Sequence, residues 1–543
     1  MGLSDLFIDA KDLPEGGYGF CQLLFLLAAY GYILFQASNL ISDGSELLLL
    51  VPSLAGLVGS CVLPVLGAVP DGAIVLFSGM GPDAQEQLSV GVGALAGSTI
   101  MLLTVPWFLS VYAGSVDIED GECVYRKPKV SGMKAVFWDM GVQPTADVRY
   151  GAQIMMLTSL SYLLIQVPAG YLHGPEEEIA KGEKKWALAA MLVCIIAFVS
   201  YLVYQYIAAQ KADEDSSLNL KVDAVVVERI QKGEISLLGA LNSVIHLAAP
   251  ETASEATPLK DETPLEKRLK AILKPFFHKY DTDHNASLER SELGVVMSDL
   301  GMHVSADDLN KRFERYDIDS DGSVSFHEFV QGTADMLREE DVQTFIKANS
   351  RGEGEAANGV ATAEEDEEEE EMPEEFVSLP PDVQQRRILM RAFYMMGLGT
   401  GLVLVFSDPM VDVLSELGNR INVTPFYVSF VLAPLASNAS ELLASYNYAL
   451  KKTSKSITIS LTALEGAGSM NNTFCLGIFM VLIYTQGLAW EFTAETIAIL
   501  FAQFAVGLIA LAPVQRVWHA AVVLAIYPVS LILVSALEAI GFD

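Results

Sequence analysis

About ten blocks of this chain are apolar over the length needed to cross a bilayer. A hydrophobic fraction of 51% and a mean hydropathy of +0.36 are too high for an ordinary soluble protein of 543 residues. Backbone groups inside lipid must be hydrogen-bonded within the chain, so each block is expected to form a helix. The blocks lie near residues 17–41, 47–79, 87–113, 150–172, 186–209, 388–408, 424–450, 457–484, 494–513 and 517–538.

Five blocks precede residue 210 and five follow residue 387. An odd number of spans ends on the opposite side of the membrane, so the second half must enter from the side opposite to the first. The sequence therefore predicts an all-α membrane protein of ten transmembrane helices, arranged as two inverted five-helix repeats. In transporters built this way, ions bind near the midplane on Gly- or Pro-interrupted helices. We expect three domains, at 1–209, 210–387 and 388–543.

The negative charge is concentrated between the two halves. Residues 211–390 hold 40 acidic and 19 basic side chains, which gives 21 of the 34 excess negative charges of the whole chain. This acidity belongs to a soluble insert and argues against nucleic-acid binding. Within the insert, residues of about 349–375 include an unbroken acidic run at 364–371, whose like charges repel. We expect that stretch to be a disordered linker.

No signal peptide is expected in Met1–Gly17, which lack a basic region leading into a short apolar core.

Lysine and arginine are unevenly distributed between the short loops on the two sides of the membrane. The richer side is expected to be cytosolic, which puts the insert in the cytosol and both termini on the other side of a vacuolar or plasma membrane. The basic residues of the richer side are Arg126, Lys127, Lys129, Lys134, Arg149, Lys451, Lys452, Lys455 and Arg516; those of the other side are Lys11, Lys181, Lys184, Lys185 and Arg420.

The second span of each half carries an acidic residue. Asp71 lies in the apolar stretch Leu66–Gly72, and Glu441 lies in Ala436–Leu442. Prolines at 64, 70 and 434 interrupt the same stretches. A carboxylate near the bilayer centre costs about 3 kcal/mol, so an unpaired one is expected to face a cavity or ion pathway. Both acids are therefore candidates for an ion site.

Neutral oxygens accompany the two acids, because the third span of each half has small residues followed by Gly-Ser and further polar side chains. Calcium takes six to eight oxygen ligands, and two carboxylates with several neutral oxygens would suit it. If sodium or protons compete for the same carboxylates, loading one ion expels the other. The alternative is that the neutral residues only let helices pack closely. The candidate ligands are Ser98, Thr99, Ser437, Asn438, Ser469, Asn471 and Asn472, and Glu465 is a further intramembrane acid.

Two twelve-residue loops in the insert fit the EF-hand template, with oxygen ligands at positions 1, 3, 5, 7, 9 and 12. Gly322 occupies the sharp turn of the second loop, whereas Ala286 occupies it in the first, so we expect the first site to be weaker. The ligands of the first loop are Asp281, Asp283, Asn285, Ser287, Glu289 and Glu292, and those of the second are Asp317, Asp319, Asp321, Ser323, Ser325 and Glu328.

The EF-hand loops start 36 residues apart, and Leu288 and Val324 fall at position 8 of each, where paired EF-hands form a short strand contact. We expect an EF-hand pair over about 263–345, with the alternative that it has lost metal binding. The helices expected around the loops are 265–280, 292–300, 306–316 and 326–338.

Taken with these motifs, Pro434–Glu441 and Met470–Thr473 resemble the α-repeats of the cation/calcium exchanger superfamily. Five spans, a cytosolic EF-hand pair and five more spans resemble the plant sodium/calcium exchanger-like proteins in particular. The resemblance implies that Asp71 and Glu441 stand at the family's central acidic positions. The first repeat departs from the pattern, because Gly67, Ala68 and Val69 offer no side-chain oxygen and the acid is the shorter Asp71.

We therefore expect a transporter and not an enzyme: a calcium/cation antiporter that works by alternating access and is regulated by calcium bound to the EF-hands. The resemblance favours sodium as the counter-ion, and protons are the alternative. A calcium-activated cation channel would need a continuous pore, and a membrane-anchored calcium sensor without transport would leave both intramembrane acids unexplained. The expected partners are calcium, sodium or protons, and the lipid bilayer.

Overall fold

The computed structural model describes residues 7–49, 62–80, 83–119, 121–125, 133–172, 176–211, 226–227, 264–281, 285, 287–299, 306–319, 321–338 and 381–542. The chain forms two compact units. One, here called the membrane unit, is Met1–Ser45, Gly59–Leu218 and Tyr394–Asp543; the other comprises Glu46–Val58 and Asn219–Phe393. The predicted acidic linker and the ligand Asp283 lie outside the described residues.

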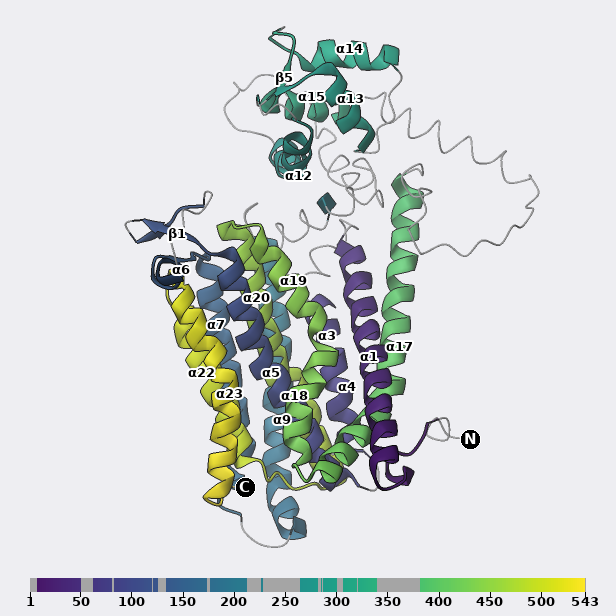
Figure 1. Ribbon diagram of the computed structural model, residues 1–543, viewed down its shortest axis with the longest axis vertical. Coiled ribbons are helices and arrows are strands. Elements are labelled where there is room, and N and C mark those ends of the chain that lie inside the picture. Colours follow the sequence, from purple (N-terminus) through teal and green to yellow (C-terminus); the bar gives the residue numbers. More distant parts are fainter. Residues whose placement is uncertain are drawn as a thin grey trace, which may run out of the picture. The chain divides into compact units, whose positions relative to one another are not determined.

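The apolar blocks form the helices shown in Figure 1. In the first half these are α1 (Gly17–Leu49), α3 (Leu63–Gly67), α4 (Val69–Ser78), α5 (Ala84–Gly114), α7 (Ala146–Ser159), α8 (Leu163–Ala169) and α9 (Glu176–Lys211). In the second half they are α17 (Pro381–Ile421), α18 (Pro425–Ser437), α19 (Ala439–Leu450), α20 (Ser454–Met470), α21 (Leu476–Gln486), α22 (Thr493–Ala510) and α23 (Val517–Ala539).

Among the described residues, 8 helical segments are long and apolar enough to cross a membrane, or 9 if α18 and α19 count as one bent span. Each coincides with one of the ten predicted blocks. The remaining block, 47–79, lies partly outside the described residues, and its described part holds α3 and α4. The chain is an integral membrane protein.

Helix α5 is the buried centre of the membrane unit and packs against α4, α18, α19, α20, α22 and α23. Two glycines permit its close contact with α18. A Cβ at Gly93 would lie 2.4 Å from the Phe426 carbonyl oxygen, and one at Gly97 would lie 2.1 Å from the Phe430 carbonyl oxygen. Small residues allow membrane helices to approach until their backbones touch. The contact brings the third span of the first half against the second span of the other.

A small antiparallel sheet, which the sequence analysis did not predict, joins two distant loops at one end of the membrane unit. Its strand order is β2 (Glu122–Cys123), β1 (Val116–Glu119), β3 (Met140–Val142) and β6 (Gln515–Arg516), and Gly141 pairs with Arg516. The loop before α20 lies there too, because the Ser454 hydroxyl donates to the Gln143 carbonyl at 2.5 Å. The three loops predicted to share one basic side therefore lie together.

The loops predicted for the other side also meet. Arg420, at the end of α17, donates to the carbonyls of Leu13 at 2.8 Å and Pro14 at 3.1 Å. Gln85, at the start of α5, exchanges hydrogen bonds with the backbone of Ala489, which lies between α21 and α22. These contacts fit helices that cross the membrane in alternating directions.

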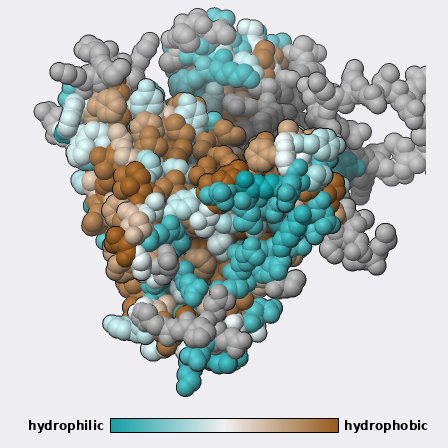
Figure 2. Space-filling model, turned by 60° about the horizontal axis from the view of Figure 1, so that its bottom comes forward, coloured by the Kyte–Doolittle hydropathy of each residue, from teal (hydrophilic) through white to brown (hydrophobic). Residues whose placement is uncertain are grey.

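Large apolar side chains remain exposed on the outer helices, as expected for surfaces in contact with lipid. Ile196 on α9, Leu508 on α22 and Ile532 on α23 are all about two-thirds exposed. Figure 2 shows a broad hydrophobic area on the left flank and hydrophilic residues toward the lower right of that view.

The EF-hand pair consists of α12 (Pro264–Tyr280), β4 (Ser287–Leu288), α13 (Arg290–Asp299), α14 (Ala306–Tyr316), β5 (Val324–Ser325) and α15 (Phe326–Arg338). The predicted strand contact is confirmed, since Leu288 pairs with Val324 in an antiparallel register. The predicted helices are confirmed to within two residues at each described boundary. Phe277 and Phe329 pack together in a buried aromatic core of the pair's own.

Candidate ion-binding sites

Both intramembrane acids follow a break in a helix. The break between α3 and α4 is at Ala68, and the break between α18 and α19, which are bent by 59°, is at Asn438. Asp71 and Glu441 each stand three residues after their break, in the first turn of the helix that follows. The unpaired amides and the dipole at a helix N-terminus stabilise negative charge. The prolines around each break therefore position a carboxylate at a favourable helix end inside the membrane.

Asp71 is the centre of a buried hydrogen-bond network that joins the two halves of the chain. Its side chain is 3% exposed and accepts a hydrogen bond from Ser98 on α5. The Ser98 oxygen in turn accepts from the Asn438 amide at 2.6 Å. Asn471 donates to Thr99 at 3.0 Å and more weakly to Ser98 at 3.4 Å. Five of the predicted ligands thus lie together, three from the first half and two from the second.

Ser437 lies beside the same network, close to the Asp71 carboxylate. Its hydroxyl donates to the Ala433 carbonyl at 3.3 Å, so its oxygen remains available as an acceptor.

Glu441 lies in the second half of the chain and approaches the first half. The carboxylate is half-buried and accepts a hydrogen bond from Ser440 at 2.8 Å. A Cβ at Gly67 would lie 3.7 Å from its Oε1 atom, so this oxygen faces the broken segment that also carries Asp71. The two acids, predicted from sequence to act together, border the same break between α3 and α4.

Two predicted ligands point elsewhere. Ser469 donates to the Glu465 carbonyl on its own helix at 3.0 Å. The Asn472 amide exchanges hydrogen bonds of 2.6 and 2.7 Å with Gln503 on α22, and also donates to Thr158 on α7 at 3.2 Å. In this conformation Ser469 bonds to the backbone of α20 and Asn472 bonds to α7 and α22, so neither side chain contacts Asp71.

Sequence reasoning missed a π-helical turn, η6 (Asn471–Cys475), between α20 and α21. Such turns occur often at functional sites because the extra residue redirects the side chains around it. Here the turn brings Cys475 to Asn471, with the Sγ atom 3.5 Å from the Asn471 Oδ1 atom. The run of three polar residues at 471–473 was the available signal, but it does not reveal the winding.

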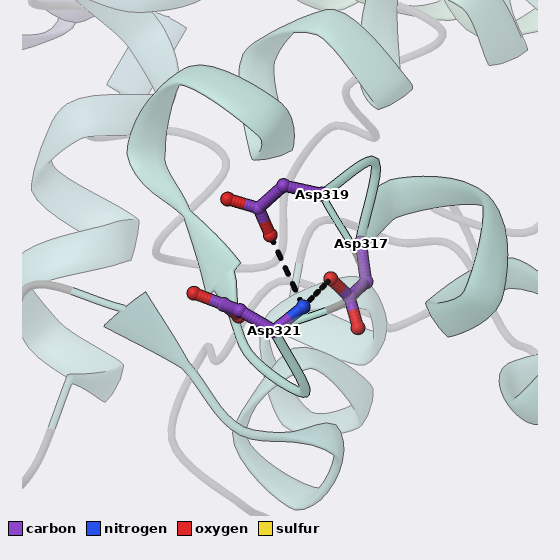
Figure 3. Close-up of side chains that lie close together, drawn as sticks. All are labelled: Asp317, Asp319 and Asp321. Atoms are coloured by element: carbon purple, nitrogen blue, oxygen red, sulfur yellow. Dashed lines mark hydrogen bonds between the residues drawn. The ribbon is translucent and has the colours of Figure 1, made fainter.

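The second EF-hand loop has the arrangement of a calcium site. Carboxylate oxygens of Asp317, Asp319 and Asp321 lie within 4.8 Å of one another. Figure 3 shows Asp317 and Asp319 converging on the Asp321 amide, which donates to them at 3.0 and 3.2 Å. Gly322 has a φ of +89°, the conformation predicted for the sharp turn.

Glu328, at position 12, closes this loop. Its Oε1 atom accepts from the amides of Ile318 and Asp319, and its Oε2 atom accepts from the amide and hydroxyl of Ser325. Burial alone would raise the pKa of the Glu328 carboxyl, but the hydrogen bonds from Ser325 and the loop amides outweigh burial and lower the pKa. The carboxylate is thus held ionised and positioned toward the loop, as bidentate calcium binding requires. Ser323 donates to Asp321 at 2.8 Å through its amide.

The first loop is described in part. The Asn285 amide donates to Asp281 at 3.0 Å, and Ser287 donates to the Asn285 side chain at 2.7 Å. The Glu289 amide donates to Glu292 at 3.0 Å, which parallels the contact of Ser325 with Glu328. Asp283 and Ala286 lie outside the described residues.

Two parts of the chain match known families. The family described as sodium/calcium exchanger protein matches residues 391–536, and the EF-hand domain pair matches residues 271–334. The second half of the chain is therefore similar to sodium/calcium exchanger proteins. The matched residues run from α17 to α23 and include Asn438, Glu441 and Asn471. That family consists of transporters and not of catalytic enzymes.

Plant sodium/calcium exchangers are similar to this protein over almost its whole length, which confirms the resemblance seen in the motifs. NCL2 and NCL1 of Oryza sativa subsp. japonica are each 28% identical and cover 96% of this chain, over 88% and 87% of their own lengths. NCL of Arabidopsis thaliana is 27% identical and covers 98% of this chain and 89% of its own. Among solved structures, the H+/Ca2+ exchanger CAX is 11% identical to this chain, with a TM-score of 0.46. The alignment covers 95% of this chain and 85% of the CAX chain.

Proposed function

We propose that this protein is a calcium/cation antiporter that exchanges calcium for sodium by alternating access. The observation that carries the proposal is the hydrogen-bonded connection from Asn438 through Ser98 to Asp71, which links the broken helices of both halves at a buried carboxylate. The similarity of the second half to sodium/calcium exchanger proteins supports it. Two inverted five-helix repeats, ten helices in all, would meet at this connection.

The chemistry of the site suits a hard divalent cation. Asp71 and Glu441 supply two negative charges, which balance one calcium ion, and Ser98, Thr99 and Asn471 supply neutral oxygens. Asn438 and Ser437 extend this set from the second repeat, with Ser469 and Asn472 as further ligands after a change of rotamer. In the present conformation the polar groups bond to one another, so an entering ion would replace these hydrogen bonds. A movement of one repeat against the other would then open the loaded site to the opposite side.

Proton coupling is a second candidate, and one specific feature favours it. Gly67, Ala68 and Val69 precede Asp71 without a side-chain oxygen, so the first repeat offers few ligands to a sodium ion. A carboxylate needs no further ligands to accept a proton. Sodium remains the leading proposal because the similar plant proteins are named sodium/calcium exchangers.

The EF-hand pair would sense calcium in the cytosol and adjust transport. Helices α9 and α17 flank the insert in sequence. Glu183 near the start of α9 accepts from the Trp490 amide, and Arg420 at the end of α17 donates to Leu13, so the ends of both helices that lead into the insert are at the side of the membrane unit that carries the sheet. The excess of basic residues makes that end cytosolic. Both termini would then be extracytosolic, in a vacuolar or plasma membrane.

Flux of radioactive calcium into proteoliposomes tests the function. We expect uptake driven by an opposing sodium gradient at fixed pH, and its loss in Asp71→Asn. Ser407→Ala is the matched control, because Ser407 is a buried residue of α17 whose hydroxyl donates only to the Val403 carbonyl. Native protein that carries no calcium under either a sodium or a pH gradient would refute the antiporter.

A further inference from the structure

Glu465 is a buried acid in the second half of the chain and is separate from the network around Asp71. It lies in α20, one turn before Ser469, and its side chain is 1% exposed. Neither carboxylate oxygen has a hydrogen-bond partner among the described residues. A fully buried, unpaired negative charge is strongly unfavourable in a low-dielectric interior, so something positive must neutralise it.

The surroundings of Glu465 leave space for the carboxylate, and no lysine or arginine of the described residues pairs with it. A Cβ at Gly151 on α7 would lie 2.1 Å from its Oε2 atom, so the carboxylate occupies the space that a side chain there would fill. On α9, the Tyr201 hydroxyl lies beside the next residue, 3.1 Å from a Cβ placed at Gly466. Gln205 donates to that hydroxyl at 2.7 Å, which holds it in place.

Helix α20 packs against α3, α5, α7, α19 and η6, and among the described residues no side chain of these elements donates a hydrogen bond to Glu465. Their charged and titratable side chains, together with those of α20 itself and the two tyrosines of α9 on this side, are Glu86 and Tyr112 on α5, Asp147, Arg149 and Tyr150 on α7, Glu441, Tyr446 and Tyr448 on α19, Cys475 on η6, Lys455 on α20, and Tyr201 and Tyr204 on α9.

We propose that Glu465 binds a monovalent cation, a proton or a sodium ion, and so forms a counter-ion site distinct from the calcium site. This inference rests on the proposed antiport function and names where one counter-ion is carried. One carboxylate balances one positive charge, whereas a divalent ion would leave an excess charge in an apolar environment. Helix α20 continues directly into the η6 turn, where Asn471 contacts Ser98 and Thr99, so occupancy at Glu465 can be transmitted to the calcium site.

The calcium gradient that proteoliposomes reach at equilibrium tests this site, because the gradient depends on the number of counter-ions exchanged per calcium ion. With the membrane potential clamped at zero, Glu465→Gln should lower the ratio of inside to outside calcium concentration at equilibrium. The ratio should fall by a factor equal to the imposed ratio of counter-ion concentrations. The loss under a sodium gradient at fixed pH would identify sodium, and the loss under a pH gradient without sodium would identify a proton. Glu538→Gln makes the same chemical change at the end of α23, where Glu538 accepts from Tyr427, and should leave accumulation unchanged.

A second variant guards against a folding defect. Gly151→Ala keeps the acid but places a methyl group where its Oε2 atom lies, and should produce the same loss of one counter-ion. Native accumulation in both variants under both gradients would overturn the counter-ion site while leaving the antiporter intact. Native protein that couples calcium to neither gradient would overturn both.

Discussion

The Asn438 amide lies 2.6 Å from the Ser98 hydroxyl oxygen, although 340 positions of the chain separate the two residues. Asn438 stands three residues before Glu441, and Ala68 holds the equivalent place before Asp71. The asparagine side chain reaches across to the first half of the chain, whereas the alanine side chain has no polar group to return the contact. The two helix breaks are thus similar in backbone and unequal in ligands, with most of the neutral side-chain oxygens around them supplied by the second half.

We expect Asp71→Asn and Glu441→Gln each to reduce calcium flux to background while the protein stays folded. Each change removes a charge that offsets the ion but keeps the volume of the side chain, and Ser98 can still donate to the carboxamide oxygen at position 71. Flux into proteoliposomes and thermal unfolding of the purified variants are the two measurements. Normal calcium uptake by either variant would show that its acid does not take part in transport.

The second EF-hand should bind calcium more tightly than the first. Gly322 is the left-handed turn residue of the second loop, and Ala286 holds the corresponding position in the sequence of the first. A Cβ in the left-handed conformation costs roughly 1–2 kcal/mol, or roughly 5–30-fold in affinity. The pair has its own aromatic core, so calorimetry can use residues 260–345 with folding checked by circular dichroism. Glu328→Gln should remove the tighter site and Glu292→Gln the weaker one. The reverse order would contradict the ranking.

Apolar length and EF-hand spacing predicted most of the helices, because both depend on local sequence. The sheet at one end of the membrane unit was missed, since strands of two to four residues at Val116–Glu119, Met140–Val142 and Gln515–Arg516 carry almost no local signal. Their pairing depends on where α5 and α22 end. Short strands formed by tertiary packing cannot be found from alternation along the chain.

The individual ligands were harder to predict than the acids. Asn471 and Asn472 are neighbours in sequence, yet one bonds to Thr99 at the centre and the other to Gln503 on α22. Successive residues in a helix point in directions about 100° apart, and the π-helical turn changes that angle locally. The composition of a polar run therefore predicts a site near it, but the winding of the backbone decides which side chain faces the ion.

Packing of α5 against α18 should depend on Gly97. A Cβ at this position would lie 2.1 Å from the Phe430 carbonyl oxygen, and a backbone atom cannot move aside as a flexible side chain can. We expect Gly97→Ala to destabilise the protein by about 1–3 kcal/mol, as overpacking in other cores does. Gly401→Ala is the control, because a Cβ at Gly401 meets no atom within 4 Å. Equal thermal stability of the two variants in detergent would contradict close backbone contact between α5 and α18.

The choice of counter-ion gives the last prediction, which follows from the unequal repeats. If sodium is carried, its ligands should come mostly from the second repeat, because Gly67 and Ala68 supply no side-chain oxygen. Asn438→Ala removes the amide that contacts Ser98 but leaves Asp71 and Glu441 to neutralise calcium. We therefore expect the variant to require more sodium for half-maximal exchange, with a smaller change in the calcium concentration required. Ser407→Ala should alter neither value. Proteoliposome flux at fixed pH with varied sodium, and at fixed sodium with varied pH, measures both dependences. Calcium flux that ignores sodium and follows the pH gradient would exclude sodium and assign the exchange to protons.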